Sequence, residues 1–224
     1  MIKQAMILAA GEGRRMQPLT LSTPKPLLQA GKKTLIEHQL DKLIAAGIES
    51  VIINVAYLGQ QIMDFLGDGE RYGVAIQYSL EPEPLETAGA INHALTALDN
   101  QPFLLVNSDV WCDYPLEQLT QMDVGDAHLV MIPNPAHNSS GDFGLNNGLV
   151  VKAGSNQTSC TFSGLSVFHP SVIESYPRRR PIFPLREVFH WLAPQKRLTG
   201  ELYRGAWMDI GTPERLAVLR EVLS

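Results

Sequence analysis

A glycine-rich segment near the N-terminus carries residues suited to binding phosphate groups. Residues 11–20 are GEGRRMQPLT, and residues 23–26 are TPKP. The two glycines let backbone N–H groups approach an anion closely, and the guanidinium of Arg15 can donate paired hydrogen bonds to phosphate oxygens. Prolines on both sides of Lys25 restrict its backbone, which suits a cation that needs a fixed position. We predict that Arg15 and Lys25 hold a polyphosphate.

This segment differs from the two common nucleotide-binding loops. A dinucleotide-binding loop needs a third glycine and a helix directly behind it. Met16 occupies that third position, and Pro18 prevents a helix two residues later. A P-loop needs Gly-Lys-Ser/Thr, which residues 11–26 lack. We therefore expect a long, extended phosphate loop of another kind.

Two aspartates are candidates for binding a metal ion. Asp109 ends the sequence Asn107-Ser108-Asp109 after an apolar run, and Asp209 lies within WMDIGT at residues 207–212. Mg²⁺ usually takes one or two protein carboxylates and completes its shell with substrate phosphates and water. We predict that Asp109 and Asp209 hold Mg²⁺ beside the phosphates.

The segments that must position these residues alternate between strand and helix patterns in the first half of the chain. Apolar and β-branched runs predict strands at residues 5–10, 50–55, 74–78 and 103–106. Helical patterns lie between them, at residues 35–46, 59–66 and 87–98, the last with Thr87 as its N-cap. This order predicts an α/β fold with a mostly parallel sheet flanked by helices on both faces. The glycine loop and Asp109 then meet at the carboxyl ends of the strands.

The second half of the chain is richer in strands and turns. Strands are expected at residues 127–132, 149–151, 161–168 and 198–203, and helices at residues 184–192 and 212–222. Residues 133–160 are rich in Asn, Gly and Ser, and we interpret them as an insertion or lid over a substrate. We expect a single domain over residues 1–224, with a nucleotide-binding half at 1–110 and a sugar-phosphate-binding half at 111–224.

Composition and charge exclude several classes of function. The net charge of −5 argues against a nucleic-acid partner. Cys112 and Cys160 are too few for a disulfide framework or a thiolate zinc site. The apolar run at residues 5–10 is too short for a signal peptide, and no run reaches the ~20 apolar residues of a membrane span. We expect a cytoplasmic protein with no membrane partner.

The pattern GxGxRxxPLT followed by PKP, together with Ser108-Asp109 and WxDIGT, resembles the sugar-1-phosphate nucleotidylyltransferase family over essentially the whole chain. The resemblance implies a Rossmann-like fold, similar to that of GT-A glycosyltransferases, with a β-rich sugar-binding insertion. It also implies that Arg15 and Lys25 hold the phosphates as catalytic residues. The implied contacts to base and ribose come from Leu8, Ala9, Ala10, Gly11, Glu12 and Gly13.

The chemistry that this family implies needs no general base. An oxygen of a sugar 1-phosphate attacks the α-phosphorus of a nucleoside triphosphate in line, and pyrophosphate leaves. Because the attacking oxygen is already anionic, positioning and cationic stabilisation supply most of the catalysis. Arg15, Lys25 and Mg²⁺ are expected to supply that stabilisation.

The base is expected to lie against the segment from Glu81 to Gly89. The Glu81 carboxylate could accept the uracil N3–H or the guanine N1–H and N2–H, so charge alone leaves the base open. The small residues Ala88 and Gly89 would let a planar base or ribose lie close.

The details of the resemblance favour UTP over GTP. Guanylyltransferases of the family show Leu-Gly-Thr-Ala-Gly where residues 85–89 are LETAG. Together with residues 107–114, 141–143, 162–170 and 203–205, this sequence resembles the subgroup that uses UTP and N-acetylmuramate 1-phosphate in peptidoglycan recycling. By that resemblance the sugar pocket is formed by Asn107, Asp142, Gly144, Ser163 and Gly164. The lactyl carboxylate of the sugar is expected to meet Arg204 or the basic run at residues 178–180.

Two departures from the family pattern concern the sugar phosphate and the assembly. The Glu-Lys-Pro element that often binds the sugar phosphate is missing, and the nearest basic residue is Lys152. The chain also lacks the C-terminal extension that larger relatives use for oligomer contacts, so we expect a monomer.

Three other functions compete with this interpretation. One is guanylyl transfer from GTP to mannose or heptose 1-phosphate. Another is a nucleotide-sugar glycosyltransferase, but these usually carry Asp-x-Asp where this chain has Asn107-Ser108-Asp109. The third is a nucleotide sensor without catalysis, which the retained aspartates and loop cations disfavour.

Overall fold

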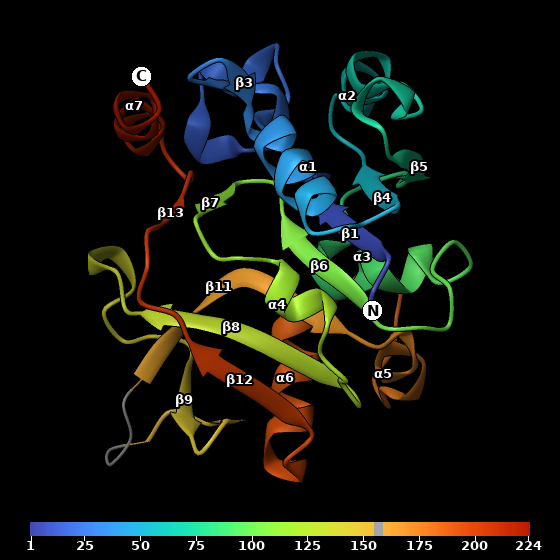
Figure 1. Ribbon diagram of the computed structural model, residues 1–224, viewed down its shortest axis with the longest axis vertical. Coiled ribbons are helices and arrows are strands. Elements are labelled where there is room, and N and C mark those ends of the chain that lie inside the picture. The colour runs from blue at the N-terminus through green and yellow to red at the C-terminus, as the bar shows by residue number, and fades with distance from the viewer. Residues whose placement is uncertain (155–158) are drawn as a thin grey trace.

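A nine-stranded mixed sheet forms the centre of the computed structural model, which describes residues 1–154 and 159–224 (Figure 1). The strand order is β5-β4-β1-β6-β11-β8-β12-β10-β9. In chain order these strands are β1 (Gln4–Leu8), β4 (Ser50–Val55), β5 (Ala75–Leu80), β6 (Phe103–Asn107), β8 (Ala127–Pro133), β9 (Phe143–Asn146), β10 (Leu149–Val151), β11 (Ser159–Phe168) and β12 (Leu198–Leu202). Two smaller pairs complete the strands: β2 (Gln29–Ala30) with β3 (Lys33–Thr34), and β7 (Val110–Cys112) with β13 (Trp207–Asp209).

The first half of the chain forms the parallel part of this sheet. β5, β4, β1 and β6 run parallel, and Ile7 of β1 lies opposite Ile53 and Val106. Side chains alternate between the faces of a strand. Ala5 and Ile7 therefore pack into one core cluster, whereas Met6 packs into the other.

Helices cover both faces, as the alternating pattern predicts. α1 (Leu35–Ala45), α2 (Gly59–Leu66) and α4 (Glu117–Thr120) contribute to the first cluster. α3 (Glu86–Ala94), α5 (Pro170–Ser175) and α6 (Leu185–Leu192) contribute to the second. α1 begins with a capping box, because Thr34 accepts from the Glu37 N–H while the Glu37 carboxylate accepts from the Thr34 N–H.

The predicted start of α3 is wrong by one residue, and the predicted N-cap, Thr87, does not cap the helix. The helix begins at Glu86 after Leu85, and no side chain caps it. The hydroxyl of Thr87 instead accepts a hydrogen bond of 2.7 Å from the N–H of Leu185. The residue therefore joins α3 to the start of α6, a contact between distant segments that a local pattern does not reveal.

The second half of the chain continues the sheet with antiparallel pairs. β11 pairs antiparallel with β6 on one side and β8 on the other, so it joins the two halves. β9 and β10, from the segment predicted as an insertion or lid, pair with each other at the end of the strand order, and β9 also pairs antiparallel with β11. Residues 155–158 of that segment lie outside the described residues.

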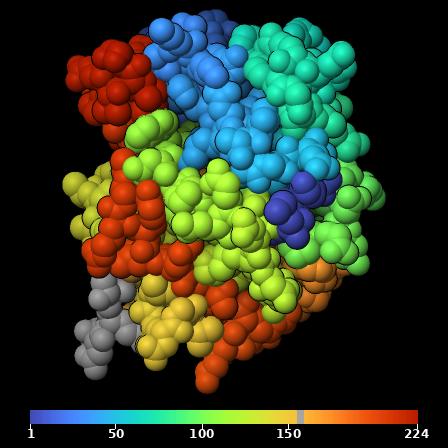
Figure 2. Space-filling view, viewed as in Figure 1, coloured from blue at the N-terminus to red at the C-terminus, as the bar shows by residue number. Residues whose placement is uncertain are grey.

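The C-terminal helix α7 (Pro213–Val222) packs against the N-terminal part of the chain. Figure 2 shows it, in red, beside the blue segment that follows the glycine loop. Leu216 and Leu219 of α7 share a buried cluster with Met16 and Leu28. α7 thus packs against the phosphate loop and the segment that follows it.

Membrane-crossing helices are absent from the described ranges, since none of the helices in residues 1–154 and 159–224 is both long and apolar enough.

Candidate active site

A cavity of about 450 Å³ lies where β1 and β6 end. Its size is in the range of small-molecule sites. The residues that line it come from the end of β1, the glycine loop, the segment before α3 and the end of β6: Leu8, Ala9, Ala10, Gly11, Gly13, Arg14, Arg15, Met16, Lys25, Pro26, Asn54, Glu81, Pro84, Leu85, Glu86, Thr87, Asn107, Ser108, Asp109 and Gly211. The cationic side chains of Arg15 and Lys25 therefore lie at one cavity, which suits a polyphosphate.

The glycine loop is folded tightly around Gly13. This residue has a φ of 62°, and a Cβ there would lie 3.0 Å from the Thr20 methyl and 3.2 Å from Lys25 Cβ. Thr20 also donates from its hydroxyl to the Gly13 carbonyl. Gly13 is thus needed both for its left-handed backbone and for the close approach of Lys25.

Met16, at the position of the third glycine in dinucleotide loops, is fully buried. Its side chain packs with Ile210, Leu216 and Leu219. Met16 argues against a dinucleotide-binding loop, and it is also the residue through which α7 supports the glycine loop.

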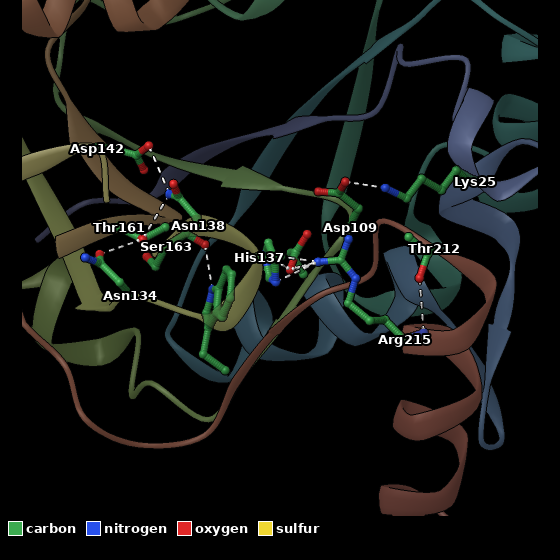
Figure 3. Close-up of polar contacts among 12 residues, drawn as sticks. Lys25, Asp109, Asn134, His137, Asn138, Asp142, Thr161, Ser163, Thr212 and Arg215 are labelled. Carbon is green, nitrogen blue, oxygen red and sulfur yellow. Dashed lines mark hydrogen bonds and ion pairs between the residues drawn. The ribbon is translucent and has the colours of Figure 1, made fainter. Parts of the chain in front are cut away.

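Lys25 forms an ion pair with Asp109 at the floor of the cavity (Figure 3). The Lys25 side chain is 11% exposed and that of Asp109 is 33% exposed. The structure thus brings together the loop cation and the strand-end carboxylate that the sequence predicts for one crevice.

A buried hydrogen-bond chain connects β1 to the segment before α3. Asn54 accepts from the Ala9 N–H at 2.8 Å and donates to Glu81 at 2.8 Å. The other Glu81 oxygen accepts from the Leu85 N–H at 3.0 Å. Burial raises the pKa of the Glu81 carboxyl above its ordinary value, while these two hydrogen bonds act in the opposite direction. Glu81 lies at the cavity as predicted, but its carboxylate already holds the turn that precedes α3.

A smaller cavity of about 240 Å³ adjoins the first one through two shared residues, Asn107 and Asp109. Its walls are mostly polar and come from β6, the segment after β8, β11 and β13: Asn107, Asp109, Val110, His137, Asn138, Thr161, Phe162, Ser163, Gly164, Trp207 and Asp209. The Trp207 indole donates to the Ser163 carbonyl at 2.8 Å, which fixes one wall. Such a wall offers the hydrogen-bonding groups that a sugar requires.

Asp209, the second predicted metal ligand, is close to Asp109 in this smaller cavity. The N–H of Ile210 donates to the Asp109 carbonyl at 2.7 Å, and both aspartates line the cavity. The Asp209 carboxylate is paired with Arg215, and His137 Nε2 lies 3.0 Å from the same carboxylate oxygen. Arg215 and His137 carry no role in the sequence prediction.

Several predicted site residues do not line either cavity. Glu12 turns outward and pairs with Arg14. Ala88 and Gly89 lie behind the larger cavity, where both N–H groups donate to the Phe183 carbonyl. A Cβ on Gly89 would lie 2.4 Å from the Pro181 carbonyl oxygen. The small size of Ala88 and Gly89 is therefore explained by the packing of residues 181–183 on α3 rather than by a bound base.

The predicted sugar residues divide into two groups. Asn107, Ser163 and Gly164 line the smaller cavity, as expected. Asp142 does not, but it accepts hydrogen bonds from Asn138 and from the Phe162 N–H, so it supports that wall from behind (Figure 3).

Gly144, and the basic residues that the sequence analysis considered for binding the sugar substrate, do not line either cavity. Gly144 pairs within the sheet with Val151 and Ser159. Lys152, Arg204 and the basic run at residues 178–180 are absent from the residues that line either cavity in the described part of the chain. Arg180 instead pairs with Glu187 of α6.

The sequence prediction missed Asn54 at the larger cavity, and the residues that it missed around the smaller one come mainly from two places. His137 and Asn138 belong to the turn after β8, and Trp207 belongs to the WMDIGT motif, from which only the aspartate was chosen. Arg215 follows that motif directly in GTPER. The motif letters could have identified Trp207 and Arg215, but nothing in the local sequence marks His137.

Comparisons with known proteins agree with this geometry. A model of the nucleotidyl transferase family matches residues 4–222. The chain is 43% identical over 220 residues to an N-acetylmuramate alpha-1-phosphate uridylyltransferase from Neisseria meningitidis serogroup B, with 95% of both chains covered. It is 32% identical to a mannose-1-phosphate guanyltransferase from Gibberella zeae, covering 94% of this chain and 61% of that one. The solved structure of HddC from Yersinia pseudotuberculosis complexed with GMP-PN superposes with a TM-score of 0.80 and 21% identity over 100% of both chains, which shows a shared fold.

Proposed function

Because the chain belongs to the nucleotidyl transferase family, we propose that it transfers UMP from UTP to N-acetylmuramate 1-phosphate, giving UDP-N-acetylmuramate and pyrophosphate. The family expected from the glycine loop and the two aspartate motifs is thereby confirmed. The observation that carries the proposal is the pair of adjoining cavities, one lined with Arg15 and Lys25 and the other with polar groups suited to a sugar. The relative at 43% identity supports the choice of base and sugar.

The proposed reaction is a displacement at phosphorus. An oxygen of the sugar phosphate forms a bond to the α-phosphorus of UTP, and the bond from that phosphorus to the bridging oxygen of the β-phosphate breaks. Pyrophosphate leaves with the electron pair. Arg15 and Lys25 face the larger cavity, where they stabilise the charge on the triphosphate and on the leaving group.

Asp109 and Asp209 fit a bound Mg²⁺. Both are carboxylates that line the same cavity, and each already faces a cationic side chain, Lys25 or Arg215. Within the described ranges no three His, Cys, Asp or Glu residues form a closed metal cage. An ion that takes two carboxylates and completes its shell with phosphates suits this donor set. When bound, Mg²⁺ would neutralise phosphate charge and draw the two substrates together.

The product would serve peptidoglycan recycling, and the proposed location is the cytoplasm. The monomeric state stays a prediction.

Guanylyl transfer to mannose 1-phosphate is the second candidate. It is supported by the relative at 32% identity and by Glu81, whose carboxylate lies in the nucleotide cavity and could accept guanine N–H groups. Both oxygens of Glu81 already accept hydrogen bonds from the protein, which favours the smaller demand of a uracil N3–H.

A matrix of substrates separates the candidates. Initial rates of pyrophosphate release would be measured with UTP or GTP against N-acetylmuramate, N-acetylglucosamine, mannose and heptose 1-phosphates. We expect the highest kcat/KM for UTP with N-acetylmuramate 1-phosphate. A higher kcat/KM for any GTP pair would contradict the proposal, and binding of UTP without turnover would indicate a sensor.

A further inference from the structure

The smaller cavity has polar walls for a sugar but few cations for the phosphate that the sugar must carry. Among the described residues that line it, His137 is the only one with a basic side chain. Asp109 and Asp209 add negative charge to the same space. A sugar 1-phosphate is itself an anion. Besides the Mg²⁺ proposed above, its phosphate needs a cationic side chain, which the lining residues other than His137 do not supply.

Arg215 does not itself line either cavity, but its guanidinium lies beside residues that line both. Its Nη1 is paired with Asp209 and lies 3.0 Å from His137 Nε2, and both partners line the smaller cavity. Its Nη2 lies on the side of Gly211, which lines the larger cavity, at 2.7 Å from the position of a Cβ on that glycine. Figure 3 shows the guanidinium pointing toward His137.

The same glycine also lies next to the triphosphate cation of the loop. A Cβ on Gly211 would lie 3.2 Å from Arg15 Nη2 and 3.1 Å from Asp209 Oδ2. Arg15 and Arg215 therefore approach Gly211 together. In the proposed reaction the sugar phosphate attacks the α-phosphate of the nucleotide, and a position between the two cavities suits that encounter.

The position of Arg215 in its helix is unfavourable by itself. Thr212 is the N-cap of α7 and accepts a hydrogen bond from the Arg215 N–H, so Arg215 lies in the first helical turn. A cation there is repelled by the positive end of the helix dipole, at a typical cost of about 0.3–1 kcal/mol. An arginine at this position therefore needs another reason than the stability of α7.

We propose that Arg215, assisted by His137, binds the phosphate group of the sugar 1-phosphate. This inference rests on the proposed reaction, in which such a phosphate attacks. All the side-chain contacts given for Arg215 in the described structure use Nη1. The guanidinium has further N–H donors in a planar fork, so Nη2 and Nε can donate to phosphate oxygens while Nη1 keeps its contact with Asp209.

The test compares the phosphorylated and unphosphorylated sugars. N-acetylmuramate 1-phosphate and N-acetylmuramic acid would be titrated calorimetrically into the protein in the presence of Mg²⁺ and a non-hydrolysable α,β-imido analogue of UTP. For Arg215→Gln we expect the preference for the phosphorylated sugar to fall about 10- to 100-fold, the range for hydrogen bonds to charged groups. The Kd of the UTP analogue should change less than about threefold, because other cations hold the triphosphate.

Arg220→Gln is the matched control, because Arg220 lies on the same helix and donates to the Gln29 carbonyl away from both cavities. It should keep the wild-type preference. His137→Ala should lower the preference about three- to tenfold, since one imidazole N–H is worth less than a guanidinium. Because His137 is exposed, this variant tests the proposal even if Arg215→Gln fails to fold.

Two results would overturn the inference. One is an Arg215→Gln protein, folded by circular dichroism, whose affinity for the sugar 1-phosphate stays within twofold of wild type. The other is an equal loss of affinity for both sugars, which would mean that Arg215 only positions Asp209. If the wild type prefers another sugar 1-phosphate of the matrix, the proposed substrate fails, and the Arg215 comparison is made with that sugar and its phosphate. A wild type that binds no sugar 1-phosphate contradicts both proposals.

Discussion

At the scale of single residues, the site balances charge by pairing each metal-binding candidate with a cation. Asp109 faces Lys25 and Asp209 faces Arg215, so neither carboxylate is left alone before substrate arrives. Lys25 is the more buried member of its pair, and an unpaired charge there would be costly. These two ion pairs hold the four side chains in place until the phosphates of the substrates bind and replace some of the contacts.

Replacing Asp109 with Asn should abolish turnover. The expected fall in kcat is at least about 10³-fold, because one of two carboxylates proposed for Mg²⁺ is lost. The free energy of unfolding should fall by about 1–3 kcal/mol, less than for a fully buried pair, because Asp109 is one-third exposed. Pyrophosphate release and urea denaturation measure the two effects, and calorimetry with Mg²⁺ and the UTP analogue measures metal binding directly.

The control for this variant is Asp41→Asn, which removes an exposed carboxylate paired with Lys33. It should leave both quantities nearly unchanged. Near-normal activity of the Asp109→Asn protein would contradict the metal assignment.

Gly211→Ala should lower kcat/KM by about 10- to 100-fold, the effect expected when reacting groups are displaced by up to 1 Å. The new Cβ would lie 2.7 Å from Arg215 Nη2, so the guanidinium must move. Stability should change by less than about 1 kcal/mol, since only the ends of side chains are displaced. Steady-state kinetics and thermal unfolding give these values.

Gly125→Ala provides the comparison, because nothing lies within 4 Å of the position of its Cβ. We expect wild-type kinetics for that variant. An equally active Gly211→Ala protein would show that the guanidinium has more room than the structure gives it.

At the scale of elements, α7 links the C-terminus to the phosphate loop. Leu219 is fully buried with Met16, whereas Val218 on the same helix is 47% exposed. Leu219→Ala should cost about 2–4 kcal/mol of stability, because it leaves a cavity in a small cluster. It should also raise the KM for UTP, because the loop that carries Arg15 loses support.

Val218→Ala changes the same helix at an exposed position and should alter stability by less than about 0.5 kcal/mol. Urea denaturation and UTP kinetics on both variants test the link. If Leu219→Ala loses stability but keeps the wild-type KM for UTP, α7 is a passive support and does not shape the loop.

The elements also show which parts of the site can be predicted from sequence. Strand ends and the loops next to them are local features, so the sequence is enough to predict that Arg15, Lys25 and Asp109 lie at one cavity. The partners of Gly89 and Thr87 come from residues 181–185, about a hundred positions later, and their roles were therefore missed. Small residues and hydroxyls fit many environments, and only the tertiary structure selects one.

At the scale of the whole molecule, the two halves of the chain share one sheet. β11 of the second half pairs with β6 of the first along four residues, from Leu165 to Phe168. The buried strand residues Leu104 and Val106 belong to a cluster that also contains Leu165 and Val167. The halves at 1–110 and 111–224 are therefore expected to describe binding roles rather than independent folding units.

We accordingly predict a single unfolding transition for the full chain and no stable fold for residues 1–110 alone. All three tryptophans, Trp111, Trp191 and Trp207, lie in the second half. Tryptophan fluorescence therefore reports on that half, whereas far-UV circular dichroism reports on both. Coincident denaturation curves are the expected result. Separate midpoints, or a folded fragment of residues 1–110, would show two independent units.

Distant segments also explain why the second cavity was only partly predicted. His137 comes from the turn after β8 and Arg215 from α7, 78 residues further along, and they meet only because both reach Asp209. The contact depends on how β8 and β13, which belong to different sheets, lie in the tertiary structure, and no periodicity in the sequence encodes it. That Asn107 and Ser163 lie together at one cavity could be predicted from the sequence, but the approach of His137 and Arg215 to Asp209 could not.

The most direct test of the proposed function is a competition in one reaction. UTP, GTP, N-acetylmuramate 1-phosphate and mannose 1-phosphate would be mixed at equal concentrations with Mg²⁺ and the protein. Products would be identified by ³¹P nuclear magnetic resonance and mass spectrometry at low conversion, so that their ratios report kcat/KM. We predict UDP-N-acetylmuramate with an equal amount of pyrophosphate as the main product. GDP-mannose as the main product, or no pyrophosphate at all, would contradict the assignment.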